Sequence, residues 1–325
     1  MKRTNMNILK KTLILLFVGI VSLSFAQDIN EAGTAFNDGN EAYKAKKYAE
    51  AVENYTTSID MCQLIGADAA DLQSKVEAQL VNALYKNSLT LYKGKKFDAA
   101  VEELEKTIKA AEVAGNDKTA KKAKAYIPKV YSSEGMGLVK AKKYDEALAA
   151  FDKALAYKEG CVNAYYGQGL AFKGKEDIDA AIKSFEAVVA NGAGKAKADK
   201  TVKKAKSAGQ KMLEANAAKE LQIEHTQKAI DYLNKSLDFG ANSANTYYML
   251  ALAYNKQKKY ADAISAANTG LTIEGADQSS IQFELGKAYE GKGDSANACT
   301  AYKAVVSGPN VKAAAFQVKE VLKCK

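Results

Sequence analysis

The sequence predicts an all-α protein made of stacked helix-turn-helix units, and three observations point to this fold class. A small residue is followed four positions later by a bulky apolar residue at regular places along the chain, and another small residue lies twelve positions upstream of each. No segment alternates apolar and polar residues as a strand would, and the chain has only two prolines. Helices that cross at small side chains leave a gap, and a large neighbouring side chain fills it.

The copies of this pattern recur at spacings too regular for chance. The pairs are Ala51/Tyr55, Ala100/Leu104, Ala147/Phe151, Ala181/Phe185, Ala229/Leu233, Ala263/Ala267 and Ala298/Tyr302, of which the sixth lacks its bulky member. The upstream small residues are Gly39, Ser88, Gly135, Gly169, Ala217, Ala251 and Gly286. Successive pairs are separated by 49, 47, 34, 48, 34 and 35 residues.

These spacings resemble the tetratricopeptide repeat (TPR), a unit of about 34 residues with the pattern W-x2-L-G-x2-Y…A-x3-F…P. The resemblance extends over almost the whole chain beyond residue 26, although tryptophan is absent and no unit has the terminal proline. It implies a TPR-type α-solenoid, a right-handed superhelix of about seven repeats with a C-terminal capping helix. It also implies a scaffold that binds partner proteins.

We expect one continuous helical domain over residues 28–325. The repeats are expected near residues 32–62, 71–111, 118–157, 162–190, 195–239, 244–273 and 279–307, and the capping helix over residues 311–323. Three intervals exceed the family spacing by 13 to 15 residues, which corresponds to about four helical turns, or three turns and a loop. We therefore expect long first helices over residues 71–92, 118–140 and 195–222, with Pro128 bending or starting the second of them.

Residues 1–26 have the pattern of a secretory signal peptide. An uncharged apolar run over residues 12–25 follows a basic segment, and Ser24 and Ala26 are small residues at the positions that signal peptidase reads. The run is shorter than the about 20 apolar residues that a membrane-spanning helix needs. We expect cleavage after Ala26 and export to the periplasm or cell envelope, with an uncleaved N-terminal anchor as the alternative.

The charge balance argues against nucleic acid as a partner. The expected signal peptide has four positive charges and no negative one, so its removal lowers the formal net charge from +9 to +5. Arg3 is the only arginine in the chain. Since arginine provides the planar, bidentate contact to phosphates and guanine edges, a sequence-reading protein without it would be unusual.

The sequence contains no recognisable catalytic, cofactor-binding or metal-binding motif. Glycine-rich phosphate loops, nucleophile elbows and paired metal motifs are all absent. The one histidine, His225, lies in a short connection with no cysteine or carboxylate at a ligand spacing, so a structural or incidental role is favoured. We therefore expect a protein without enzymatic activity, cofactor or metal.

Four cysteines in an exported chain invite disulfides. Cys299 lies early in the last repeat, and Cys324 ends the segment that should pack back against that repeat, so a bridge between them would fasten the terminal helix. Cys62 and Cys161 lie about three repeats apart, farther than the roughly 7 Å that a disulfide spans between Cα atoms. We interpret them as buried apolar residues.

Four of the expected turns share a cluster of three lysines followed by an aromatic residue: residues 44–48, 93–97, 140–144 and 256–260. The lysines lie where the first helix ends and its carbonyl groups lack partners, a place that favours cations. Capping and solvation are therefore favoured over a binding patch.

The resemblance implies a concave groove lined by the first helix of each repeat. Its expected residues are Phe36, Asn40, Tyr43, Tyr85, Tyr92, Tyr166, Leu170, Tyr248, Leu252, Asn255 and Phe283. Tyrosine is enriched at interface hot spots, and a rim of lysines would suit a peptide with acidic flanks. The alternative is that these aromatic residues pack against the next helix and leave little exposed surface.

The leading hypothesis is a non-enzymatic scaffold of the cell envelope that binds a partner protein or peptide in this Tyr/Leu groove. The second hypothesis is a structural envelope protein that docks on anionic lipid or cell-wall polymer through residues 195–211, which hold seven lysines and one acid, Asp199. Alanine alternates with these lysines and gives the segment no apolar face for insertion, so a solvated helix face is favoured there.

Overall fold

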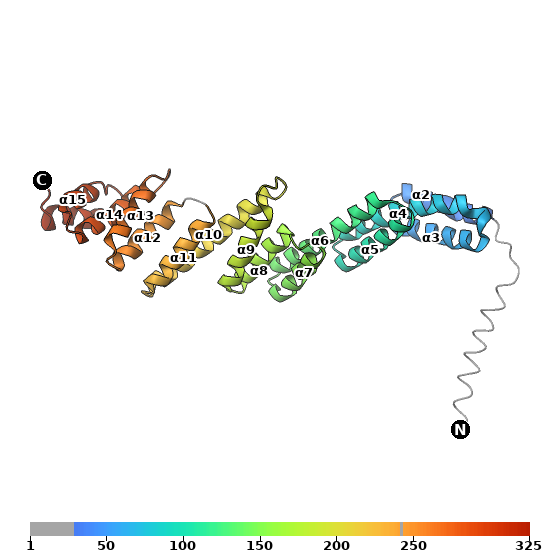
Figure 1. The fold of residues 1–325 in the computed structure, drawn as a ribbon, viewed down its shortest axis with the longest axis horizontal. Helices are drawn as coiled ribbons and strands as arrows, with labels where there is room; N and C mark the ends of the chain where they lie inside the picture. The colour runs from blue at the N-terminus through green and yellow to red at the C-terminus, as the bar shows by residue number, and fades with distance from the viewer. Residues whose placement is uncertain (1–28, 241–242) are drawn as a thin grey trace, which may run out of the picture. The chain divides into compact units, whose positions relative to one another are not determined.

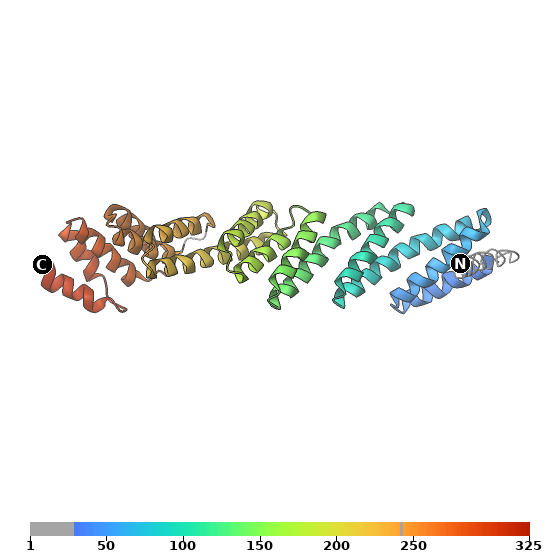
Figure 2. The same cartoon turned by 90° about the horizontal axis from the view of Figure 1, so that it is seen from below.

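The computed structural model describes residues 29–240 and 243–325, which form an all-α array of helical pairs (Figures 1 and 2). No strand occurs among these residues, so the expected all-α class is confirmed. The expected signal peptide, residues 1–26, lies outside the described residues. The chain divides into two units, of which the first ends at residue 134 and also contains residues 153–159, and the second contains residues 135–152 and 160–325.

The first unit begins with the hairpin of α2 (Ile29–Lys44) and α3 (Tyr48–Ile65), which lie side by side in both views (Figures 1 and 2). A short 3-10 turn, η1 (Ala67–Ala69), leads to α4 (Ala70–Lys93), which pairs with α5 (Phe97–Val113). The next helices are α6 (Asp117–Lys140) and α7 (Tyr144–Tyr157), and each contributes residues to both units.

The second unit continues with four further hairpins and a terminal segment. The hairpins are α8 (Val162–Gly174) with α9 (Ile178–Gly192), α10 (Asp199–Gln222) with α11 (Thr226–Asp238), α12 (Ala244–Lys256) with α13 (Tyr260–Leu271), and α14 (Gln278–Gly291) with α15 (Ser295–Lys303). The first helices of successive pairs also contact one another, α8 with α10, α10 with α12 and α12 with α14. The first helices therefore form one row, on which the groove residues of this unit lie.

Four hairpins cross at glycine, where a large side chain of the second helix occupies the space that a Cβ atom would need. The pairs are Gly39 with Tyr55, Gly135 with Phe151, Gly169 with Phe185, and Gly286 with Tyr302. A Cβ atom at each glycine would lie 2.5 to 2.6 Å from the ring, whereas carbon atoms in contact normally stay about 3.5 to 4.0 Å apart. The small-to-large spacing in the sequence therefore corresponds to close contacts between the two helices of a hairpin.

The lysine-rich turns end the first helices with a repeated backbone geometry. Lys46, Lys95, Lys142 and Lys258 all have φ between 58° and 61°, in the left-handed region. The next residue closes the helix end, as in the bond from the Lys47 N–H to the Ala42 carbonyl at 2.9 Å. This Schellman arrangement satisfies the terminal carbonyl groups. Backbone N–H groups thus cap these helices, and the lysine side chains are exposed.

The three expected long helices are present, and two of them, α4 and α6, begin within one residue of the expected position. Helices α4, α6 and α10 each contain 24 residues, whereas α8 and α12 contain 13, a difference of about three turns. Helix α10 begins at Asp199 and not at residue 195, because residues 193–198 form turns before it. Pro128 lies in the interior of α6 and does not start that helix.

The C-terminal segment folds back onto the last hairpin. Residues expected as one capping helix form α16 (Val311–Phe316) followed by a π-helical turn, η2 (Gln317–Val321). Its apolar side chains pack on a core formed by Ala298, Tyr302 and Val305. A disulfide joins Cys299 to Cys324, with Cα atoms 5.7 Å apart. Cys62 and Cys161 are buried thiols.

Among the described residues, no helix combines the length and the apolar character that crossing a bilayer requires.

Candidate functional site

Three of the expected groove residues are aromatic rings that lie against the large residue of the second helix. The pairs and their centroid distances are Phe36 and Tyr55 (6.0 Å), Tyr166 and Phe185 (6.1 Å), and Phe283 and Tyr302 (5.8 Å). All three groove residues are half-buried. Part of the surface of each ring is thus buried by packing within the hairpin, and the rest is accessible to solvent.

The α2 groove residues take part in contacts within the first hairpin. The side-chain oxygen of Asn40 accepts a hydrogen bond from the Tyr55 hydroxyl at 2.8 Å. The ring of Tyr43 lies 5.4 Å from that of Tyr48, edge to face. Burial, followed by the influence of Tyr48, raises the pKa of Tyr43. Asn40 therefore helps to hold the hairpin, and one of the two acceptor positions of its oxygen is occupied.

The α4 groove residues are also half-buried. The carbonyl of Tyr85 accepts a hydrogen bond from the Ser88 hydroxyl at 2.7 Å. The Tyr92 hydroxyl is 2.8 Å from the Ser133 hydroxyl, and the Lys129 ammonium lies 5.7 Å from the centre of the Tyr92 ring. Tyr92 therefore connects α4 to α6 within the first unit.

The groove residues of α12 meet a buried carboxylate on α14. The Asn255 amide donates to the carbonyl and to the carboxylate of Glu284, both at 2.8 Å, and Glu284 is 3% exposed. The Lys287 ammonium donates to the same carboxylate at 3.0 and 3.1 Å. Burial raises the pKa of Tyr248, and the charge of Glu284 adds to this shift. The Glu284 carboxylate neutralises Lys287, so this part of the row has little net charge.

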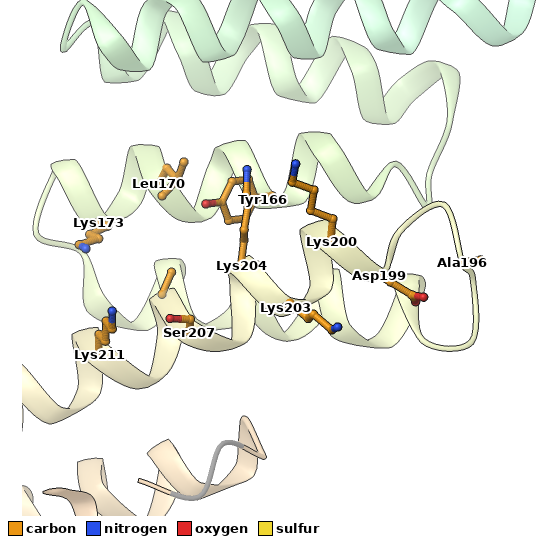
Figure 3. Close-up of a pocket in the computed structure, with 11 residues that line it drawn as sticks. Tyr166, Leu170, Lys173, Ala196, Asp199, Lys200, Lys203, Lys204, Ser207 and Lys211 are labelled. Carbon is orange, nitrogen blue, oxygen red and sulfur yellow. The ribbon is translucent and has the colours of Figure 1, made fainter. Parts of the chain in front are cut away.

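Two groove residues, Tyr166 and Leu170, line an open hollow of about 900 Å³ between α8 and α10 (Figure 3). We call this hollow the α8/α10 groove. Its lining residues are Tyr166, Leu170, Lys173, Ala196, Asp199, Lys200, Lys203, Lys204, Ser207, Ala208 and Lys211. Figure 3 shows Lys200 and Lys204 reaching from α10 toward α8, with Lys204 beside Tyr166. Both apolar residues pack beneath on the core around Phe185, and burial raises the pKa of Tyr166.

The groove is strongly basic. Five lysines and one carboxylate line it, and within the described part of the chain none of the five ammonium groups forms an ion pair. Lys200 and Lys204 are four residues apart on one face of α10, a spacing at which like charges destabilise a helix by about 0.2 to 0.5 kcal/mol. A bound anion would remove this repulsion.

The sequence interpretation treated the aromatic groove and the lysine-rich segment as rival binding surfaces, whereas the structure brings them together. The lysines at positions 200, 204 and 211 share one face of α10, and that face is turned toward Tyr166 and Leu170 on the preceding first helix. The sequence did contain a signal for this arrangement: the lysines recur at helical spacing, and the first helices of successive repeats lie next to one another in such arrays. Lys173 at the end of α8 was missed entirely.

His225 has a carboxylate neighbour in the structure that its place in the sequence did not indicate. Its Nδ1 lies 3.0 Å from a carboxylate oxygen of Glu220, and the Lys228 ammonium lies 2.7 Å from the other oxygen. Hydrogen bonding from Lys228, then from His225, lowers the pKa of Glu220. The left-handed turn at Glu224 (φ 63°) brings the three residues together. Among described residues, no group of three His, Cys, Asp or Glu side chains could hold a metal ion.

Comparison with protein families finds the model described as tetratricopeptide repeat, which matches residues 133–196 and 248–315. The first stretch contains α8 with Tyr166, Leu170 and Lys173, and the second begins within α12 and includes α13, α14 and α15. A comparison with curated proteins found no match.

Several solved structures are similar to this chain. MamA shares 21% identity at a TM-score of 0.36, covering 61% of this chain and 97% of its own. YrrB, described as a TPR protein with an unusual peptide-binding site, shares 17% identity at 0.34, covering 60% of this chain and 88% of its own. The pilF protein of Pseudomonas aeruginosa shares 15% identity at 0.32, covering 58% of this chain and 80% of its own.

Proposed function

We propose that this chain is a non-enzymatic interaction scaffold that holds an acidic segment of a partner protein in the α8/α10 groove. The tetratricopeptide repeat model, which describes a family of partner-binding proteins, matches residues 133–196 and 248–315 and supports this proposal. The observation that supports this proposal is that two half-buried side chains, Tyr166 and Leu170, lie in a hollow lined by five lysines, none of which forms an ion pair within the described residues.

The energetics require both kinds of side chain. An exposed ion pair contributes about 0.2 to 1 kcal/mol, so five pairs together give about 1 to 5 kcal/mol. A micromolar complex needs about 8 kcal/mol, and the remainder has to come from apolar contact with Tyr166 and Leu170. The partner segment therefore combines carboxylates with at least one apolar side chain. Lysine is a compact charge without a directional fork, so the ammonium groups set the charge of the segment more than its orientation.

Charge reversal in the groove tests this proposal. The probe is a fluorescein-labelled ten-residue peptide of Asp, Glu and Leu, and its Asn/Gln/Leu analogue serves as the uncharged reference, both followed by fluorescence polarisation. We expect only the acidic peptide to bind, and Lys204→Glu to weaken its binding by about two- to thirtyfold, since one attraction becomes a repulsion. Added salt should weaken the complex as well.

The matched control is Lys183→Glu. Lys183 is exposed on α9, outside the groove, and its reversal changes the net charge equally. If both reversals weaken binding alike, binding follows the net charge of the protein and the groove assignment fails. Sedimentation with anionic vesicles tests the alternative. If the protein binds the vesicles but not the acidic peptide, docking on anionic lipid is favoured and the proposal is overturned.

A second pair of variants tests the apolar part. Tyr166→Ala should weaken peptide binding, whereas Tyr248→Ala, on α12 and outside the α8/α10 groove, should not. Both residues are half-buried, so thermal melting of both variants separates a loss of folding from a loss of contact. Equal weakening at unchanged melting temperature would refute the placement of the site on α8.

We also propose that the protein works outside the cytoplasm, in the periplasm or cell envelope. The support is the signal-peptide pattern of residues 1–26 together with the disulfide between Cys299 and Cys324, a bond favoured in oxidising compartments. Fractionation of the native host, with sequencing of the mature N-terminus, tests it. A mature chain that begins at Gln27 in the envelope fraction agrees with the proposal, and an intact N-terminus in the cytosol contradicts it.

A further inference from the structure

The last hairpin ends in an apolar face that the C-terminal segment, residues 311–325, covers. The buried residues of this face are Ala298, Tyr302 and Val305. Within the segment, which the structure describes throughout, only Ala314 is buried, and Phe316 and Val321 are 58% and 48% exposed. The segment therefore buries little apolar surface for its length, and apolar contact alone holds it weakly.

Three features of the segment oppose its folded-back conformation. The side-chain oxygen of Gln317 is buried and has no hydrogen-bond partner among the described residues, and a buried polar atom without a partner is destabilising. Lys323 has φ 48°, a left-handed conformation that residues other than glycine adopt at a cost. The turn η2, which begins at Gln317, is π-helical, a rare geometry. The disulfide closes a loop of 25 residues, which favours the folded-back segment on the order of a hundredfold and compensates for these costs.

The disulfide is accessible to thiols. Cys299 and Cys324 are both half-buried, so a small thiolate can reach the bond. Lys303 lies four positions after Cys299 on α15, and its ammonium group donates a hydrogen bond to the carbonyl of Lys325. Lys323 and Lys325 flank Cys324 in the chain. These positive charges favour Cys324 as a thiolate, the form in which it leaves when the sulfur of Cys299 is attacked.

The turn that leads the chain back onto the last hairpin is a hinge. Gly308 has φ 81°, which glycine adopts without strain, and a Cβ atom there would meet no atom within 4 Å. The next residue is a proline, and a residue before proline favours an extended backbone. Before this turn, the hydroxyl oxygen of Ser279 accepts hydrogen bonds from the N–H groups of Val306 and Ser307 at 3.2 and 3.1 Å. The chain is therefore held up to Ser307, and opening is confined to residues 308–310.

We propose that a small thiol opens the Cys299–Cys324 disulfide, that two copies of the chain then exchange their C-terminal segments, and that the disulfide re-forms between the copies to give a covalent dimer. The second copy's segment fits the uncovered face because it makes there the same contacts that it makes on its own hairpin. The contacts seen in one chain therefore supply the interface. The exchange uses no residue of the α8/α10 groove, so it is independent of the proposed function.

The chemistry is a thiol–disulfide exchange that consumes no oxidant or reductant overall. The thiolate of a small thiol, such as glutathione, attacks the Sγ atom of Cys299 and forms a mixed disulfide there. The electron pair of the broken S–S bond leaves with Cys324 as its thiolate. After the segments have exchanged, the Cys324 thiolate of the second copy attacks the same Cys299 sulfur. The S–S bond between the copies forms, and the small thiolate is released.

Isotope labelling tests whether segments exchange. Equal amounts of unlabelled and heavy-isotope-labelled protein are incubated together with reduced and oxidised glutathione, alkylated with iodoacetamide and separated under non-reducing conditions. We expect a covalent dimer in which mass spectrometry finds an unlabelled Cys299 peptide joined to a labelled Cys324 peptide, and no such dimer without glutathione. A dimer joined through Cys62, Cys161 or two Cys324 residues would overturn the proposal. So would a disulfide that glutathione does not open, or a protein that stays monomeric at every concentration after it opens.

Two glycine variants test the hinge by size-exclusion chromatography with light scattering in the same glutathione buffer. Gly308→Ala should shift the monomer–dimer equilibrium toward the dimer by about tenfold or more, because the closed turn becomes strained in both copies and the open chain does not. Gly293→Ala is the matched control, since Gly293 has φ 84° in the turn between α14 and α15 and also has no atom within 4 Å of an added Cβ. That turn is the same in monomer and dimer, so the equilibrium should not change. Equal shifts in both variants, or no shift in Gly308→Ala, would refute the hinge and with it the exchange.

Discussion

The substitution Gly167→Ala tests how closely neighbouring hairpins pack in the second unit. Gly167 lies on α8 and faces Phe151, the large residue of the preceding hairpin. A Cβ atom at Gly167 would lie 2.1 Å from Cζ and 2.3 Å from Cε1 of Phe151. The ring cannot retreat, because a Cβ atom at Gly135 on its other side would lie 2.5 Å from it. Phe151 is thus held between two glycines of successive first helices, and it is fully buried.

The magnitude follows from two opposing effects. Overpacking a well-packed core costs about 1 to 3 kcal/mol, whereas replacing a helix-interior glycine by alanine contributes about 0.5 to 1 kcal/mol of stability through backbone entropy. The contact is shorter than an ordinary carbon contact by about 1.5 Å, so the cost lies at the upper end. We therefore expect Gly167→Ala to destabilise the fold by about 1 to 2 kcal/mol.

Urea denaturation followed by circular dichroism at the helical signal measures this effect. The matched control is Gly137→Ala on α6, where no atom lies within 4 Å of the added Cβ; that variant should gain about 0.5 to 1 kcal/mol. The double variant Gly167→Ala with Phe151→Leu should recover part of the loss, since the smaller side chain makes room. If Gly167→Ala is as stable as Gly137→Ala, the reasoning from close contact is refuted.

Three further predictions concern a helix-ending turn, the disulfide and a helix N-cap. Lys142→Gly should raise the free energy of unfolding by about 0.5 to 1 kcal/mol relative to Lys142→Ala, because φ is 60° there and glycine adopts this region without strain; equal denaturation midpoints would contradict this. Reducing the Cys299–Cys324 disulfide, which closes a loop of 25 residues, should lower the free energy of unfolding by about 3 kcal/mol through loop entropy. Hydrogen exchange in α15 and α16 should then become faster, and exchange rates unchanged by reduction would contradict this. Asp277→Ala should cost about 1 kcal/mol at pH 7 through loss of the α14 N-cap. Hydrogen bonds from the Ser280 hydroxyl and N–H lower the pKa of Asp277 in the folded protein. The stability that Asp277 contributes is therefore fully present above the ordinary carboxyl pKa of about 3.9 and is lost as the pH falls through the lower pKa of the folded state. A stability difference between Asp277→Ala and the unchanged protein that persists at pH 2 would disprove this.

The fold could be predicted from the sequence because its main contacts are close along the chain. Gly135 and Phe151 belong to one hairpin, and their spacing alone fixes which side chains meet. The same holds for the disulfide, which joins α15 of the last hairpin to the end of the segment that packs on it. Such contacts depend on helix periodicity and a short turn, and both leave a clear pattern in the sequence.

The candidate site could be predicted only in part, because it depends on contacts between successive hairpins. Tyr166 and Leu170 were placed on a groove, but the lysines beside them were assigned to a separate surface. Which face of α10 meets α8 depends on where α10 begins, and the turns over residues 193–198 set that start at Asp199. Similarly, the left-handed turn at Glu224 brings Glu220 to His225, a placement that residue spacing did not reveal.

Site-directed photo-crosslinking measures the central claim most directly. A photoreactive amino acid replaces Ser207, which is exposed and lines the α8/α10 groove, or Lys183, which is exposed outside it. After irradiation with the acidic peptide, mass spectrometry should find the peptide attached at position 207 and not at position 183. Equal crosslinking at both positions, or crosslinking at 183 alone, would contradict the assignment of this groove as the binding site.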